Sequence, residues 1–190
     1  GTPAEGSPTV QEQSILHRPR SIRRATAGWA LLALGLSLGC ASSSGPPLQP
    51  LDRKIDLERF MGDWHVTGFI PITVPFFSEE GAHNAVESYR LTEDGIIETT
   101  YTFRKDAFDG PRKRYTPKGW VHDERTNTEW RMQFVWPLRS PYLIVYLDPD
   151  YQQTIIGVPD RSHVWILSRT PEVSDDRYSE LVGIVARLGH

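Results

Sequence analysis

Between residues 56 and 169 the chain consists of short apolar and polar alternations, divided by turn-forming residues about every ten positions. The clearest alternation runs from Trp130 to Trp136, where even-numbered residues are apolar while Arg131 and Gln133 are polar. Successive side chains of a strand face opposite ways, so this segment predicts a strand with one dry and one wet face. The same pattern predicts strands over 62–70, 82–91, 96–103, 113–121, 129–136, 143–147, 154–158 and 164–169.

The last segment changes to a helical period. Ser174 is a helix-capping residue followed by two aspartates, and Gly189 is suited to end the helix. The predicted strand 143–147 is apolar on both faces and needs a cover. Closure removes exposed sheet edges, so we expect an all-β fold: an eight-stranded antiparallel up-and-down barrel with one amphipathic helix packed outside. The apolar positions of that helix are Tyr178, Leu181, Val182, Val185 and Leu188.

Upstream of the barrel, basic residues at 18–24 precede an apolar run at 25–38 and then Cys40. This order resembles a bacterial lipoprotein signal, in which the cysteine becomes the lipid-modified first residue. Ser37 stands where that signal usually has leucine, so a secretory signal with a chance cysteine or a single spanning helix stays an alternative, although the run is short for a span. We expect an upstream overrun or expression remnant (1–17), a signal peptide (18–39), a lipidated N-terminus with a flexible tether (40–55) and one domain (56–190). Within the tether, residues 41–51 are rich in Ser, Gly and Pro and have nothing to bury.

Composition narrows the function classes. Cleavage before Cys40 leaves 17 basic and 22 acidic residues, a balance that argues against nucleic acid as a partner. With its one cysteine lipidated, the chain forms no internal disulfide, so the core holds the fold alone. Six Trp, seven Tyr and seven Phe indicate a dense core or the walls of an apolar cavity.

Several motifs resemble the lipocalin family, in particular the bacterial outer-membrane lipoproteins related to apolipoprotein D. They are Gly62-Asp63-Trp64 opening the first strand, the turn 148–151, Arg169 ending the eighth strand, and the stretches 83–89, 108–115 and 132–137. In an up-and-down barrel the first strand's start, this turn and Arg169 lie at one end, where the guanidinium can stack on the indole. The resemblance implies a closed base built from Gly62, Trp64, Asp150, Tyr151 and Arg169.

The other end is then the mouth, formed by the predicted loops 71–83, 105–112, 137–142 and 159–162. Apolar residues Phe76 and Phe77 are expected there, either as a flexible lip or packed under their own loop. Arg112, Lys113 and Arg114 form either a solvated turn or a basic rim for anionic lipid heads. Since the tether joins the barrel beside the base, the anchor and the mouth are expected to begin at opposite ends. The roughly fifteen residues of the tether could extend about 50 Å, however, which lets the domain turn over and bring the mouth to the membrane.

The predicted interior is apolar and aromatic. Glu87 is interpreted as an outward carboxylate, with a buried polar anchor as the alternative, and no inward face is assigned for strands 82–91, 143–147, 154–158 and 164–169. The candidate ligand-binding residues are Val66, Ile70, Tyr101, Phe103, Tyr115, Trp130, Met132, Phe134 and Trp136.

The resemblance implies a lipid-binding protein of the Gram-negative outer membrane, anchored through Cys40, that stores or transports a fatty acid or lysophospholipid for envelope maintenance. A homodimer is an open possibility. No catalytic residue, cofactor or metal is expected, because no nucleophile motif occurs and His65, His83, His122 and His163 fall on separate segments. The alternatives are an enzyme acting on a lipid-like substrate and a structural envelope lipoprotein whose barrel is filled by side chains.

Overall fold

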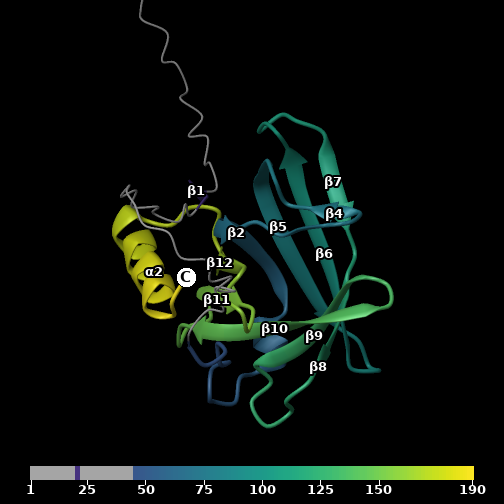
Figure 1. The fold of residues 1–190 in the computed structure, drawn as a ribbon, viewed down its shortest axis with the longest axis vertical. Helices are drawn as coiled ribbons and strands as arrows, with labels where there is room; N and C mark the ends of the chain where they lie inside the picture. Colours follow the sequence, from purple (N-terminus) through teal and green to yellow (C-terminus); the bar gives the residue numbers. More distant parts are fainter. Residues whose placement is uncertain (1–19, 22–44) are drawn as a thin grey trace, which may run out of the picture.

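The computed structural model describes residues 20–21 and 45–190, and its main sheet closes into a barrel (Figure 1). Neighbouring barrel strands are antiparallel, and β2 closes the circle by pairing with both β12 and β5. This confirms the predicted eight-stranded up-and-down barrel. In chain order its strands are β2 (Gly62–Ile70), β5 (Ala82–Leu91), β6 (Ile96–Lys105), β7 (Arg112–Tyr115) continued by β8 (Lys118–Val121), β9 (Glu129–Val135), β10 (Leu138–Leu147), β11 (Gln153–Gly157) and β12 (Val164–Ser168).

The smaller elements lie around this barrel. Helix α1 (Leu57–Phe60) precedes β2, and β3 (Thr73–Val74) with β4 (Phe77–Ser78) forms a short hairpin in the β2–β5 connection. The backbone of β1 (Arg20–Ser21) pairs in parallel with β2. Helix α2 (Asp175–Arg187) packs against the outside of the barrel (Figure 1), capped by the Ser174 side chain as the sequence predicts.

Two apolar clusters result from this arrangement. One fills the barrel and includes Ile144 and Leu147, whereas the other lies between the barrel and α2 and includes Leu143, Val145 and Leu181. Strand β10 therefore buries both faces, and α2 provides the cover that its apolar run predicts. Each such buried aliphatic side chain stabilises the fold by about 1.5–3 kcal/mol relative to exposure.

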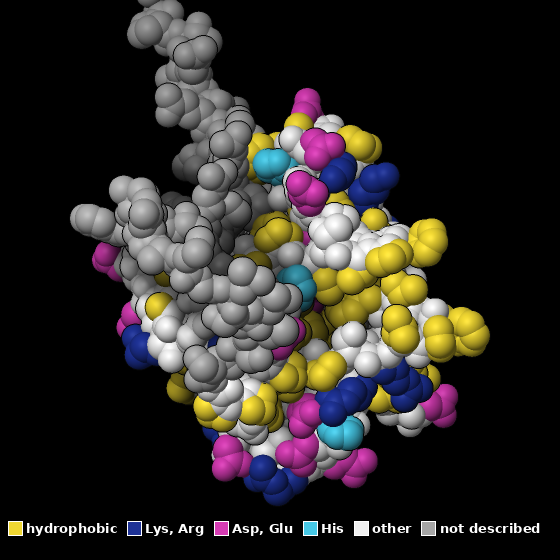
Figure 2. Space-filling view, in the orientation of Figure 1, with side chains coloured by type: hydrophobic (Ala, Val, Ile, Leu, Met, Phe, Trp, Pro, Cys, Tyr) yellow, Lys and Arg dark blue, Asp and Glu magenta, His cyan; other side chains and the backbone are white. Residues whose placement is uncertain are grey.

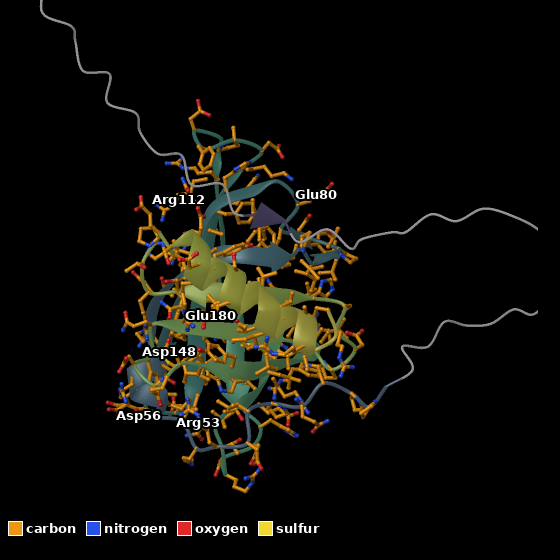
Figure 3. The ribbon with its side chains drawn as sticks, turned by 90° about the vertical axis from the view of Figure 1, so that its left-hand side faces the viewer. Arg53, Asp56, Glu80, Arg112, Asp148 and Glu180 are labelled. Atoms are coloured by element: carbon orange, nitrogen blue, oxygen red, sulfur yellow. The ribbon has the colours of Figure 1, made fainter. Side chains whose placement is uncertain are left out.

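The connections alternate between the two ends of the barrel. We call mouth the end formed by the β2–β5, β6–β7, β9–β10 and β11–β12 connections, and base the opposite end, where α1 lies. Figure 3 separates the two: Glu80 and Arg112 lie at the top, whereas Asp56 and Asp148 lie at the bottom.

Two strand predictions are corrected. The fourth strand, predicted as one segment, is divided into β7 and β8 around Pro117, which lacks a backbone donor. The predicted loop 137–142 is wrong, because β10 begins at Leu138 and pairs with β9 from there. Pro141 is compatible with this strand because β11 pairs with β10 only from Leu143 onward, so the outer edge of β10 needs no donor at Pro141.

Residues 45–55 are also not the free tether that the sequence predicts, because Leu48 and Ile55 are buried. The amide of Leu48 donates to the Pro159 carbonyl (2.9 Å) beside the mouth, and that of Ile55 to Thr126 (2.9 Å) at the base. The segment thus runs along the outside of the barrel. The described part of the segment therefore starts beside the mouth, so the expectation that the tether extends freely from the base is wrong.

Candidate functional site

The base of the barrel is closed by a guanidinium on an indole. Arg169 lies 3.8 Å from the ring centre of Trp64, which is fully buried. It also donates to the carbonyls of Asp63 (2.9 Å) and Arg59 (2.8 Å). It thereby satisfies a carbonyl of the short helix α1 that has no partner within the helix. Gly62 has φ +95°, a conformation that side chains rarely adopt, and a β-carbon there would lie 3.3 Å from the Arg169 guanidinium. Both the backbone conformation and the close approach favour glycine at this position.

The turn between β10 and β11 completes the base. Tyr151 accepts a hydrogen bond from the Asp56 amide through its hydroxyl (2.9 Å), and its own carbonyl accepts from Arg169 (3.3 Å). The carboxylate that organises this turn belongs to Asp148, which accepts the amides of Asp150 (2.8 Å) and Gln152 (2.8 Å). Asp150 contributes through its backbone, and sequence reasoning missed the part played by Asp148.

Seven of the candidate lining residues lie in the barrel core. Five are buried and two are partly buried against the same cluster; they are Val66, Tyr101, Phe103, Trp130 and Met132, then Tyr115 and Phe134. The alternation of β9 up to Phe134 and the inward parity of β6 are thus seen in the structure.

The inward placement of Ile70 and Trp136 is wrong. In β2 the register shifts between Val66 and Gly68, so Thr67 is an extra residue that reverses the alternation beyond it. Phe69 therefore enters the barrel core, whereas Ile70 packs outside, against the cluster under α2. Trp136 stands in the tight β9–β10 turn, beyond the last paired residue of β9, and is 82% exposed.

The β2–β5 connection plugs the barrel with Phe77. This ring is 4% exposed and lies among aromatic rings of the interior, with its centre 4.7 Å from that of Tyr115 and 5.4 Å from that of Phe134. Its neighbour Phe76 has φ +69° and is 94% exposed. The expectation of two lip residues at the mouth therefore fails for Phe77.

Glu79, from the same connection, is buried inside the mouth. Its carboxylate accepts the indole N–H of Trp165 (2.9 Å) and the amide of Ile72 (2.9 Å). Burial, together with the nearby Glu87, raises the pKa of Glu79 to about 7, although these two donors lower it in part. Glu79 thus joins the plug-bearing loop to β12.

Glu87 is buried as well, so its interpretation as an outward carboxylate is wrong and the alternative of a buried polar anchor describes it. A register shift between His83 and Val86 sets the inward face of β5 as Ala85, Glu87 and Tyr89. The hydroxyls of Tyr89 and Tyr142 both donate to Glu87, the latter at 2.9 Å. Burial raises the pKa of Glu87, while these two hydroxyls lower it in part.

A small cavity remains between these groups. The space left for water is about 10 Å³, close to the volume that one water molecule needs. The barrel is therefore nearly filled by its own side chains with the plug in place. The lining comprises Phe77, Glu79, Glu87, Thr99, Tyr101, Pro117, Met132, Phe134, Tyr142 and Trp165.

The outer surface of the mouth is apolar. Among the described residues, the large hydrophobic side chains that stand exposed are Val74, Phe76, Trp136 and Leu138, which all belong to the β2–β5 and β9–β10 connections or their flanking strand residues. We call these four residues the apolar tip. Figure 2 shows hydrophobic side chains gathered on the right-hand side, where Figure 1 places β4 and the end of the β9–β10 hairpin. Arg112, Lys113 and Arg114 are exposed on β7 at the same end.

Sequence reasoning missed Glu79, Tyr89, Tyr142 and Trp165 as interior residues. For Tyr89 the sequence held a signal, because residues 87 and 89 are two apart in one predicted strand and therefore face the same side of the sheet. Glu79 carried none, because a loop residue has no periodicity that reveals burial.

Other expectations concern parts of the chain that the structure leaves undescribed. Cys40 and the signal peptide lie outside the described residues, apart from the backbone of β1. Within residues 20–21 and 45–190, no helix is long and apolar enough to cross a membrane. In the same residues no three His, Cys, Asp or Glu side chains gather where they could hold a metal ion.

Comparisons with known proteins agree with this architecture. Temperature-induced lipocalin-1 of Arabidopsis thaliana is 30% identical over 149 residues, which cover 73% of this chain and 75% of the relative. The outer membrane lipoprotein Blc of Escherichia coli K12 is 26% identical over 163 residues, which cover 84% of this chain and 88% of the relative. A solved biogenic amine-binding protein shares the fold, with a TM-score of 0.52 at 16% identity over 75% of this chain and 80% of its own. The lipocalin-like domain model matches residues 55–190, and the chain therefore belongs to the lipocalin family.

Proposed function

We propose that this protein is a membrane-anchored lipid carrier that takes up a fatty acid or lysophospholipid in its barrel and stores or transports it for envelope maintenance. The observation that carries the proposal is the plug. Phe77 fills the aromatic interior from a connection rather than from a barrel strand. A connection can withdraw without breaking the barrel ladder, which would open a lined apolar space.

The orientation of the chain supports a role at a membrane. The described segment begins beside the mouth, where Arg161 donates to the Pro46 carbonyl (3.0 Å). The six residues from Cys40 to Pro46 span at most about 20 Å. An anchor on Cys40 would therefore hold the mouth, with its apolar tip and the basic residues of β7, close to the lipid surface.

A structural lipoprotein is the second candidate, because the closed barrel leaves room for about one water molecule. An enzyme is the weaker alternative, since lipocalins are generally binding proteins. Binding of a fluorescent fatty acid to the full-length chain separates carrier from structural protein.

Phe77→Ala should bind the fluorescent fatty acid more tightly than the wild type, because the plug no longer competes for the interior. Phe76→Ala is the matched control and should bind as the wild type does, since its ring is exposed. Absence of binding by both variants and by the wild type would favour the structural candidate.

A further inference from the structure

The polar groups inside the barrel make an unusual set for a lipid cavity. Two carboxylates, Glu79 and Glu87, line one space whose other walls are mostly aromatic or hydroxyl-bearing. No Lys, Arg or His is among the residues lining this cavity. The two carboxylates therefore lack a cationic partner in the cavity.

One further polar atom in the cavity is unused. The hydroxyl of Thr99 is buried, the residue being 3% exposed, and it finds no hydrogen-bond partner among the described residues. A buried hydroxyl without a partner is costly, and such atoms are uncommon in native interiors. This observation, independent of the carboxylates, indicates that a polar group is missing from the cavity.

The side chains that line the cavity indicate the charge of the missing group. An anionic head would meet two acidic side chains that burial already drives toward their neutral form. A cation would instead stabilise both carboxylates. Its remaining faces would lie against aromatic rings, which attract cations electrostatically. Tyr101, Tyr142 and Trp165 supply those rings.

We propose that the cavity between Glu79 and Glu87 binds the ammonium group of an amphiphilic amine, an alkyl or aryl chain ending in one amino group. The ammonium enters first, and the apolar body takes the place of Phe77 below the mouth. The inference rests on the part of the proposed function that puts a single-chain amphiphile inside the barrel. It assigns that amphiphile an amino head, where the proposed function names a fatty acid or lysophospholipid.

The proposal requires binding to be coupled to protons. The titratable groups facing the two carboxylates are Tyr89 on β5, Tyr101 on β6 and Tyr142 on β10, and burial raises the pKa of each well above its ordinary value. These tyrosines stay neutral, so the proton leaves from a carboxyl. An ammonium then binds more tightly as the pH rises from 5 to 8, while an alkylammonium, like lysine, keeps its own charge.

The test uses the full-length chain and three ligands of equal chain length: dodecylamine, dodecanoic acid and dodecanol. Isothermal titration calorimetry at pH 8 should give a dissociation constant for dodecylamine about tenfold or more below that of dodecanol, since a charge-assisted hydrogen bond contributes at least this factor. Dodecanoic acid should bind more weakly than dodecanol. At pH 6, titration in two buffers of different ionisation enthalpy should show proton release only with the amine.

Glu79→Gln and Glu87→Gln should each reduce the preference for dodecylamine over dodecanol, while Glu98→Gln, an exposed carboxylate of β6, should leave it unchanged. If either interior variant fails to fold, the pH dependence of the wild type decides alone. Equal or tighter binding of dodecanoic acid at pH 8 overturns this inference and leaves the carrier proposal standing. Failure of all three ligands to bind overturns both.

Discussion

Glu79 connects two parts of the molecule that are far apart in sequence, the amide of Ile72 and the indole of Trp165. It does so from a site that disfavours its charge, because burial raises its pKa to about 7 from an ordinary value of 4.5. Between pH 4.5 and about 7, the native state therefore holds a proton on Glu79 that the unfolded state releases. At the scale of single residues, the stability of the closed barrel is thus linked to pH.

This linkage gives a signed prediction. The stabilising contribution of Glu79 is fully present below pH 4.5 and is lost as the pH rises through 7, a loss of about 3 kcal/mol in unfolding free energy. Burial also raises the pKa of Glu87, so it acts in the same direction. Urea unfolding between pH 5 and 8 should show stability falling with pH, and Glu79→Gln should reduce that slope. Glu98→Gln serves as the control, and an unchanged slope in Glu79→Gln would contradict the assignment.

Arg169 gives a second prediction at this scale. Arg169→Ala removes the stacking on Trp64 and the hydrogen bonds to the α1 carbonyls, which should lower the unfolding free energy by about 2–3 kcal/mol. Arg169→Lys should recover only part of this loss, because an ammonium has no planar fork. Chemical denaturation measures both variants, with exposed Arg187→Ala as the control. A stable Arg169→Ala protein that has lost ligand binding would instead place this residue in the binding site.

At the scale of elements, the β9–β10 hairpin and the β2–β5 connection both carry exposed apolar side chains to the mouth. Trp136 and Leu138 are 82% and 68% exposed, so these side chains do not pack in the barrel core. Their exposure at the same end of the barrel as the basic residues of β7 suits an interfacial role, since tryptophan is enriched at the level of lipid headgroups.

The wild-type chain should therefore bind anionic vesicles with a blue shift of its tryptophan emission. The variant carrying Trp136→Ser and Leu138→Ser should bind several-fold more weakly at all salt concentrations. Removing charge at Arg112, Lys113 and Arg114 should weaken binding mainly at low salt, because charge attraction is screened beyond about 10 Å at moderate ionic strength. Arg125→Ser, an exposed site at the base, is the control. Vesicle binding that none of these changes alters would exclude this surface.

At the scale of the whole molecule, the path of residues 45–55 decides how the barrel faces its membrane. Leu48 and Pro46 are held beside the β11–β12 connection, so the described segment begins at the mouth, on the side of the apolar tip and the plug. An anchor on Cys40, as proposed, would be tethered to that side.

Cys40→Ser should leave the domain folded but release it from membranes in a detergent partition. In the anchored wild type, a photoactivatable lipid should label peptides of the β2–β5 and β9–β10 connections, and mass spectrometry can identify them. The base turn 122–128 should remain unlabelled. Labelling of that turn alone would mean that the mouth faces away from the membrane.

The sequence by itself determined the barrel, its strand order and the outer helix, because period-two alternation, turn residues and a capped amphipathic segment are local signals. It also indicated which residues close the base, since Trp64 and Arg169 lie in motifs that resemble those of the lipocalin family. The interior depended on the tertiary structure. The extra residue Thr67 turns Phe69 into the barrel interior in place of Ile70. The β2–β5 connection, which has no periodicity, places Phe77 and Glu79 in the same interior. Local patterns fix which residues alternate, but only the closed barrel decides which loop folds into it and where a register shift reverses the two faces.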